Sequence, residues 1–412
     1  MVTYRGVVVS VLKGFQRIEG VDAHFDLSKL GIALPGFIDM HVHLRGLELS
    51  YKEDEYSGTR AAAKGGFTLV VDMPNTKPFV RDLESLRMKI EALERYSYVD
   101  YGLFIGVNID QHQLESMLRY PAVAGIKIYP EDFEHLPQLA RIVPRGTLLV
   151  VHAEHPSLIS EPDTAEARGY RYAYRPIEAE LLAIEELAKM FASRSDVKIH
   201  ITHATSRLSV IAAKKAGFTV DTCPHYLYLT CRDEERLGCL AKVNPPLREP
   251  ETNKELLNAL HLVDAITTDH APHSLEEKSL PFNECPSGIP SIEVATSLML
   301  ELVNRGFLTL TKLAYLMSMN PAKILGLDRW GCIEPGCIAS YTVIDPRKEV
   351  RISSESFVSK ARYSPYEGMV VRGSIEATIV RGIPAYVDEV FTELVHGIPL
   401  SEVKKLGLEA ER

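Results

Sequence analysis

Short apolar runs alternate with stretches of helical periodicity along most of the chain. Segments between and after these runs carry apolar residues at three- and four-residue steps and predict helices; examples are 82–96, 177–191, 206–217 and 291–306. Ser206 and Ser291 are predicted N-caps, and Gly217 and Gly306 are predicted helix ends. The apolar runs predict strands, which are GFIDMHVH (36–43), TLVVDMP (68–74), YGLFIGV (101–107), GIKIYP (125–130), TLLVVHA (147–153), KIHITHA (198–204), TVDTCPH (219–225) and DAITTDH (264–270).

The predicted strands are nearly continuous apolar runs, which is typical of strands buried on both faces of a parallel sheet. Eight such units, alternating with helices over residues 36–330, predict an α/β fold of the (β/α)₈ TIM-like barrel type. A doubly wound open sheet is the alternative, but that architecture has no reason to stop at eight units.

The two segments that flank this predicted barrel differ from it in residue composition. Residues 1–35 and 331–392 are rich in Val, Ile, Tyr, Gly and Pro, and segments such as 341–346, 376–382 and 383–388 read as short strands joined by turns. Because chain ends often lie close together, we expect both flanks to form one small composite β domain. Residues 393–412 are a charged C-terminal tail, either a helix or a loose segment.

Composition excludes several classes of protein. The net charge of −9 argues against a nucleic-acid-binding surface, and no run of about 18 apolar residues predicts a membrane span. The six cysteines contain no CxxC pair, and they are too sparse for a disulfide scaffold. We therefore expect reduced, mostly buried thiols in a cytoplasmic protein.

Polar residues gather where the predicted strands end. His41 and His43 are two residues apart on a strand and should share one face. In a barrel all such strand ends reach the C-terminal rim, where active sites of this fold are built. Imidazoles and a carboxylate meeting there would suit a metal ion. The strand-end residues are Asp72, Pro74, Asn75, His152, His203, His225, Asp269, His270 and, just beyond, His273.

A lone buried histidine is more often a hydrogen-bonded core residue than a ligand, and that interpretation applies to six others: His24, His112, His135, His155, His200 and His261. His203 is preferred to His200 because it lies nearer its strand end. His225 stays open between a rim residue without metal contact and a ligand. Lys127 stands inside the apolar run GIKIYP, where an unpaired ammonium is costly, so it either meets a carboxylate or is neutralised chemically.

Several motifs, in order along the chain, resemble those of the cyclic amidohydrolases of the amidohydrolase superfamily, and specifically the dihydroorotases. GFIDMHVHLR is similar to the opening motif of that family, and further likenesses are VDMPNTKP, GIKIYP, VHAE, ITHAT, TTDHAPHSLEEK and SPYEGMVVRGSIEATIVRG. One segment departs from the pattern. Many members have a Pro-Gly loop after HLR, whereas this chain has Gly46-Leu47-Glu48 after Arg45.

The resemblance implies two Zn²⁺ ions. His41, His43, carbamylated Lys127 and Asp269 would hold one ion, and Lys127, His152 and His203 the other. It implies that Asp269 moves a proton in the reversible hydrolysis of dihydroorotate to N-carbamoyl-aspartate, a step of pyrimidine biosynthesis. The residues that it implies around the substrate are Arg45, Asn75, Asn244, His273, Ser287 and Gly288.

Two of these implied substrate residues could instead have a purely structural role. Arg45 is expected on the strand face of His43, reading a carboxylate with its planar guanidinium, but it could instead pair with Glu48, Glu53 or Asp54. Asn244 could be a turn residue before two prolines.

Two rival functions remain open. A sister hydrolase (dihydropyrimidinase/hydantoinase or allantoinase) would share the metal set with a different substrate clamp. A non-enzymatic amidohydrolase-like partner subunit would keep the barrel and lose ligands. The partners expected are a small-molecule substrate, and either a homo-oligomer or other pyrimidine-pathway enzymes, with no nucleic acid and no membrane.

Overall fold

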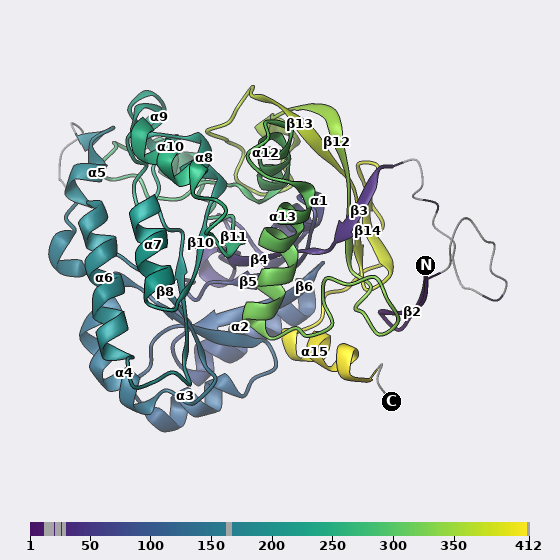
Figure 1. Cartoon of the computed structure of the whole chain (residues 1–412), viewed down its shortest axis with the longest axis horizontal. Helices are drawn as coiled ribbons and strands as arrows, with labels where there is room; N and C mark the ends of the chain where they lie inside the picture. Colours follow the sequence, from purple (N-terminus) through teal and green to yellow (C-terminus); the bar gives the residue numbers. More distant parts are fainter. Residues whose placement is uncertain (12–19, 21–25, 27–29, 162–166, 410–412) are drawn as a thin grey trace.

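Eight parallel strands form the largest sheet of the computed structural model, which describes residues 1–11, 20, 26, 30–161 and 167–409 (Figure 1). The strands lie side by side in chain order, which confirms the predicted barrel class. They are β4 (Phe37–Val42), β5 (Phe67–Asp72), β6 (Asp100–Ile105), β7 (Val123–Ile128), β8 (Leu148–His152), β9 (Lys198–Thr202), β10 (Thr219–Thr222) and β11 (Ala265–Ile266).

The barrel closes between its first and last strands. The amide of His43 donates a hydrogen bond of 2.8 Å to the carbonyl of His270, and Val42 forms a parallel bridge with His270. Every residue of β4, β5 and β6 is buried, as expected of strands covered on both faces.

Helices surround the sheet (Figure 1). The longer ones are α1 (Glu55–Lys64), α2 (Leu83–Tyr96), α3 (Gln111–Leu118), α4 (Leu136–Ile142), α6 (Ile177–Met190), α7 (Arg207–Lys215), α10 (Pro250–Asn258) and α12 (Ile292–Asn304). Shorter ones are α5 (Arg171–Tyr174), α8 (Pro224–Tyr228), α9 (Cys231–Leu237), α11 (Leu275–Lys278), α13 (Leu310–Ala314) and α14 (Asn320–Leu325). No helix in the described part of the chain is long and apolar enough to cross a membrane.

Local sequence explains where several helices begin. Asp54 and Asp82 each form a reciprocal capping box with the serine three residues later, which satisfies free amides of the first turn. Ser206 caps α7 as predicted, by accepting a hydrogen bond from the amide of Ser209. Ser291 stands at the start of α12, but its hydroxyl donates to the carbonyl of Thr268 instead of capping.

A separate antiparallel sheet joins the two ends of the chain beside the barrel (Figure 1). Among the described residues its order is β15 (Val390–Phe391), β14 (Ile383–Val387), β13 (Val370–Val380), β12 (Tyr341–Arg351) and β3 (Ile32–Pro35). β1 (Val2–Tyr4) and β2 (Val7–Ser10) form a hairpin that bridges to Ile338. The exact domain bounds, 1–35 with 331–392, 36–330 and 393–412, stay a prediction.

The C-terminal tail contains α15 (Leu400–Glu409), which covers the barrel end where β6 begins. The amide of Tyr101, on β6, donates to the carbonyl of Ile398 just before this helix. Leu400 and Val403 are buried in one cluster with residues of the barrel strands such as Ile38 and Leu69. Of the two alternatives for the tail, the structure therefore has the helix.

The cysteines correct one expectation. Cys239 is disulfide-bonded to Cys285, and Cys332 to Cys337, while Cys223 and Cys231 are buried free thiols. The prediction of six reduced thiols was wrong for four of them. The reason is spatial: the Cα atoms of Cys239 and Cys285 are 46 residues apart in sequence and 6.1 Å apart in the fold, which spacing along the chain could not reveal.

Candidate metal-dependent active site

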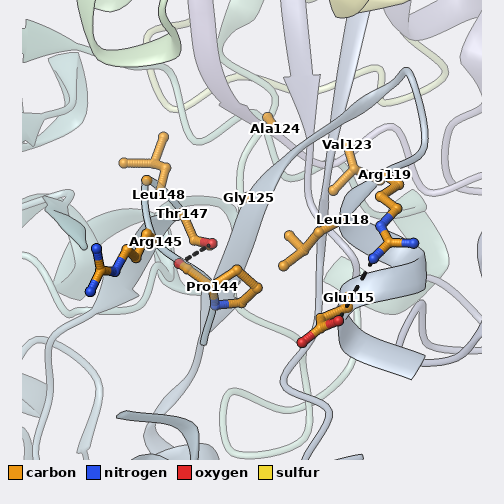
Figure 2. A pocket seen from close by; sticks show the side chains of 11 residues that line it. Glu115, Leu118, Arg119, Val123, Ala124, Gly125, Pro144, Arg145, Thr147 and Leu148 are labelled. Carbon is orange, nitrogen blue, oxygen red and sulfur yellow. Dashed lines mark hydrogen bonds and ion pairs between the residues drawn. The ribbon is translucent and has the colours of Figure 1, made fainter. Parts of the chain in front are cut away.

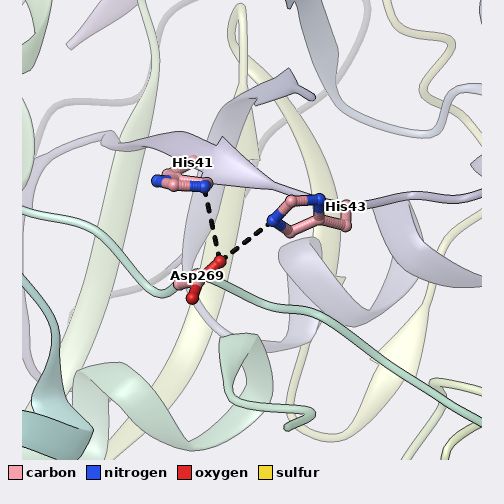
Figure 3. A group of neighbouring side chains, drawn as sticks. All are labelled: His41, His43 and Asp269. Atoms are coloured by element: carbon pink, nitrogen blue, oxygen red, sulfur yellow. Dashed lines mark hydrogen bonds and ion pairs between the residues drawn. The ribbon is translucent and has the colours of Figure 1, made fainter. Parts of the chain in front are cut away.

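Three predicted ligands meet at the closing seam of the barrel (Figure 3). The Nε2 atoms of His41 and His43 lie 3.3 and 3.0 Å from Oδ1 of Asp269, and the candidate ligand atoms lie within 4.8 Å of one another. All three side chains are buried. His41 belongs to β4 and His43 follows its last residue, whereas Asp269 comes from the segment after β11. The barrel therefore gathers residues that are 226 positions apart.

The Nδ1 atoms of the two histidines already have hydrogen-bond partners within the protein. Nδ1 of His43 lies 2.6 Å from Oδ1 of Asn75, and Nδ1 of His41 lies 2.6 Å from the hydroxyl of Thr202, which itself donates to Asp221. Since Oδ1 of Asn75 can only accept, and the Thr202 hydroxyl gives its hydrogen to Asp221, both Nδ1 atoms carry the proton. The neutral rings then turn their Nε2 lone pairs towards Asp269.

Lone pairs facing a carboxylate oxygen require a positive charge between them. Burial and the neighbouring Lys127 ammonium lower the pKa of His41 well below its ordinary value, so this ring stays neutral. A proton on His43 would satisfy one of the contacts, whereas a metal cation would satisfy all three ligands together. The residues present therefore fit a metal ion.

Lys127 extends from β7 and is fully buried. Its Nζ has no hydrogen-bond partner among the described residues, and it lies 5.2 Å from the centre of the Tyr129 ring. Burial lowers the pKa of Lys127 to about 8, against the opposing influence of Asp269. Of the two alternatives for Lys127, a carboxylate partner is therefore not found among the described residues, and its amine lies unpaired in an apolar strand.

His152 and His203 adjoin the first group, at the ends of β8 and β9. The ring centres of His41 and His203 are 5.3 Å apart, and those of His152 and His203 are 4.5 Å apart. Nδ1 of His203 is buried without a hydrogen-bond partner in the part of the chain that the structure describes. His203 also has a φ of 46°, a left-handed conformation that costs a non-glycine residue energy and turns the side chain out of the strand direction.

His225 is the second residue of the short helix α8. The side chain is fully buried against Tyr226, and neither ring nitrogen has a hydrogen-bond partner within the described residues. Burial lowers the pKa of His225 to about 4, so the ring is neutral. The choice between rim residue and ligand stays open.

Arg45 is the centre of the predicted substrate side. The strand ends at Val42, and Arg45 lies in a turn with a φ of 57°, so it does not continue the strand face of His43 as predicted. Its Nε donates to the carbonyl of Pro272 at 3.2 Å, rather than to Glu48, Glu53 or Asp54. The guanidinium is buried, and it keeps its charge without a carboxylate partner among the described residues.

His273 lies 3.2 Å from a terminal nitrogen of Arg45, through its Nε2. Lys52 contacts Nδ1 at 3.2 Å, and Nε2 also lies 3.0 Å from the carbonyl of Ser287. Burial and the cations Arg45, Lys278 and Lys52 hold the pKa of His273 far below its usual range. Arg45 thus contacts His273 and a main-chain carbonyl but no described carboxylate, so its charge remains available to a substrate carboxylate.

The other predicted substrate residues adjoin Arg45 or the histidines. Oδ1 of Asn244 accepts from the hydroxyl of Ser287 at 3.2 Å. A side chain at Gly288, where φ is 136°, would come within 2.4 Å of the carbonyl of Ala271, so only glycine fits. Asn75 uses its oxygen on His43, which leaves its amide N–H groups for a ligand.

Sequence reasoning missed the residues that hold this site. Glu154 accepts from Nε2 of His152 at 2.5 Å. Lys89 donates to Glu55 at 2.6 Å and to the carbonyl of Arg45 at 3.0 Å, and it forms an ion pair with Asp72 at 2.8 Å. Each of these charged side chains is almost fully buried. Charged residues are seldom buried unless they are paired, so charges inside the apolar segments were the available sign of such pairs.

A pocket of about 420 Å³ lies at the opposite end of the barrel strands (Figure 2). Val123, Gly125, Thr147 and Leu148 line it at the amino-terminal ends of β7 and β8. Its charged lining residues are Glu115, Arg119 and Arg145, with Glu115 and Arg119 paired at 3.7 Å. This end carries none of the strand-end histidines and is not the candidate active site.

The chain belongs to the amidohydrolase family, whose model matches residues 32–383. It is 38% identical to a dihydroorotase from Saccharolobus solfataricus, over 92% of this chain and 90% of that protein. It is 40% identical to a dihydroorotase from Aeropyrum pernix, over 86% and 83% of the two chains. The solved structure of L-hydantoinase (dihydropyrimidinase) from Arthrobacter aurescens matches with a TM-score of 0.85 over 96% of this chain and 94% of that one, at 24% identity, which shows the fold alone.

Proposed function

We propose that this chain is a dihydroorotase, which reversibly hydrolyses the cyclic amide of (S)-dihydroorotate to N-carbamoyl-L-aspartate. The observation that carries the proposal is the juxtaposition of a buried guanidinium, which has no carboxylate partner among the described residues, with a cluster of metal-ligating side chains. Dihydroorotate combines a carboxylate with a cyclic amide, which are the two groups that such a site would take. The curated relatives named dihydroorotase support the same function.

Two Zn²⁺ ions complete the proposed site. His41, His43 and Asp269 would hold one ion, His152 and His203 would hold the other, and a carbamylated Lys127 would serve both. Carbamylation suits the environment of Lys127, because a pKa of about 8 leaves part of the amine unprotonated and able to add to CO₂. The product is an anion, which removes the cost of a buried ammonium.

Bound zinc would acidify water and polarise the amide carbonyl, the usual contribution of metal ions to hydrolysis. Asp269 contacts both histidines through Oδ1, which leaves Oδ2 free to accept a proton from the attacking water. The same carboxyl then delivers that proton to the departing amide nitrogen, so the ring opens. In the reverse direction it accepts the proton from that nitrogen.

The remaining residues orient the substrate. Arg45 presents two N–H groups to the carboxylate, and charge-assisted hydrogen bonds of this kind are the stronger ones. Asn75 and Asn244 offer amide N–H groups from two other loops, since both use their side-chain oxygens within the protein. Gly288 lets the main chain approach closely, and its loop is held to His273 through Ser287.

A dihydropyrimidinase or hydantoinase is the second candidate, favoured by the likeness in fold to solved hydantoinases. Those substrates lack the carboxylate of dihydroorotate, and the buried guanidinium of Arg45 would then have no carboxylate to pair with among the described residues. A non-enzymatic subunit is disfavoured, because every residue of the predicted ligand set is present. A cytoplasmic location, a homo-oligomer and contacts with other pathway enzymes stay predictions.

The deciding experiment compares kcat/KM for dihydroorotate, dihydrouracil and hydantoin on the purified, metal-loaded protein, with the metal content measured on the same sample. We expect turnover of dihydroorotate to exceed that of the other two and about two zinc ions per chain. A preference for dihydrouracil or hydantoin would favour the sister enzymes. A folded protein without metal or turnover would favour the partner subunit.

A further inference from the structure

The structure contains an ionic network beside His152 that the proposed reaction does not use, and its members are buried except for Glu161, whose side chain is half exposed. Its first member is Glu154, which lies two residues after His152 and is fully buried. Glu154 accepts from Nε2 of His152 at 2.5 Å and takes two hydrogen bonds from Arg175, from Nε at 3.0 Å and from Nη2 at 2.5 Å. Arg175 can only donate, and it bonds to both oxygens of Glu154, which is the contact that a carboxylate makes with a guanidinium.

The network continues to the substrate side of the site. Arg175 also donates to Glu161 at 2.6 Å, and the same oxygen of Glu161 accepts from Arg171 at 3.0 Å. Arg171 is buried; it donates to the carbonyl of Val243 at 2.8 Å and to Oδ1 of Asn244. A continuous set of charge-assisted hydrogen bonds therefore runs from a predicted metal ligand to a predicted substrate contact.

An ionised Glu154 determines which ring nitrogen of His152 can bind metal. A carboxylate accepts only, so the proton of the neutral imidazole must stand on Nε2, and the Nδ1 lone pair is left for the ion. Partners of this kind fix ring orientation and raise the basicity of a metal-bound histidine. Arg175 holds Glu154 by a two-point contact, which fixes the position of the carboxylate as well as its charge.

We propose that Glu154 is a positioning residue for the second metal site, and that Arg175, Glu161 and Arg171 connect this carboxylate to Asn244. The inference rests on the proposed metal site but not on the identity of the substrate. Loss of such a partner typically lowers metal affinity by about 10–100-fold. We therefore expect Glu154→Gln to weaken binding of one zinc ion by that factor and to leave the other ion in place.

The test uses full-length apoprotein titrated with Zn²⁺ against a chromophoric chelator, without substrate. The matched control is Glu186→Gln, because Glu186 accepts from Nε2 of His155 at 2.7 Å in a similar pair that lies outside the site. The control should bind both ions within about twofold of the unmodified protein. Activity of Glu154→Gln should fall at limiting zinc and recover in excess zinc, which general damage to the fold would not do.

Zinc affinity of a folded Glu154→Gln protein within twofold of the unmodified value for both ions would overturn the proposal. If this variant does not fold, Glu154→Asp keeps the charge with a shorter reach, and unchanged zinc binding by that protein would overturn it equally. If Glu154→Gln binds zinc more weakly but the unmodified, zinc-loaded protein does not turn over dihydroorotate, the positioning role is supported and the proposed function is contradicted. The two failures are therefore distinguishable.

Discussion

The metal side and the carboxylate side of the site are built differently. His41, His152 and His203 occupy or directly follow barrel strands, and the outer ring nitrogens of His41 and His152 have side-chain partners, Thr202 and Glu154. On the carboxylate side, Arg45 and His273 lie in loops and contact main-chain carbonyls, those of Pro272 and Ser287. One side depends on strand geometry, and the other depends on how loops pack together.

Two buried lysines support the loop side by donating hydrogen bonds to main-chain carbonyls. Lys242 donates to the carbonyls of Phe282 and Cys285, and Lys278 donates to those of Cys239 and Pro286, all at 2.8 Å. These bonds and the Cys239–Cys285 disulfide fix the loop that carries Ser287 and Gly288. Because the loop side has these additional supports of its own, changes on the metal side should affect metal content and turnover, and changes on the loop side should affect substrate preference.

The largest effect is expected for Lys127→Ala on the metal side. Loss of the carbamate would remove a bridging ligand and several kcal/mol of transition-state stabilisation, which is more than about 10³-fold in kcat. Turnover and zinc content should be measured together, with Lys189→Ala on the exposed face of α6 as the control. Added acetate or propionate should restore part of the activity by occupying the gap. Normal turnover and full zinc content without added acid would remove Lys127 from the site.

Asp269→Asn should have the next largest effect. The amide cannot accept a proton from water, and groups of this kind typically contribute about 10²–10⁴-fold to the rate. We expect kcat to fall by that factor while dihydroorotate still binds, as measured by calorimetry. Asp196→Asn, at the surface beside Arg194, is the control. Near-normal kcat in Asp269→Asn would assign the proton transfer to another residue.

Arg45→Met tests the loop side directly. Truncating one partner of a desolvated charge pair costs about 2–5 kcal/mol, so kcat/KM for dihydroorotate should fall by roughly 30-fold to several thousand-fold. Zinc content and kcat/KM for dihydrouracil should change little, as should both values in Arg87→Met, whose side chain is exposed. If the ratio of kcat/KM for dihydroorotate to kcat/KM for dihydrouracil does not change, Arg45 does not bind the substrate carboxylate.

The smallest effect on turnover is expected for Cys285→Ser, which opens the disulfide beneath the substrate loop. A cross-link between residues 46 apart stabilises the fold by about 4 kcal/mol in the chain-entropy model, and one between residues 5 apart by about 2 kcal/mol. Denaturant unfolding of Cys285→Ser and Cys332→Ser should show this difference. The KM for dihydroorotate should rise only in Cys285→Ser, with kcat nearly unchanged. Equal KM values would mean that Lys242 and Lys278 suffice to hold the loop.

The sequence by itself determined the barrel and the positions of the candidate ligands. Apolar runs alternate with helices eight times, and in parallel strands all carboxyl ends lie at one rim, so histidines at strand ends had to converge. His41 and His43 could be paired from the two-residue strand period, and Lys127 could be singled out because an unpaired ammonium in an apolar strand is costly.

Only the tertiary structure decided the supports of the site and the geometry of the substrate side. Arg45 leaves the strand direction with a φ of 57°, directly after the seam where the amide of His43 bonds to His270, a contact between residues 227 positions apart. The pair of Glu154 and Arg175 and the Cys239–Cys285 disulfide likewise join segments without a common periodicity. Strand and helix periods are local properties that a chain carries in its residue order. Contacts between loops depend on where the whole barrel places their ends, and no local pattern encodes them.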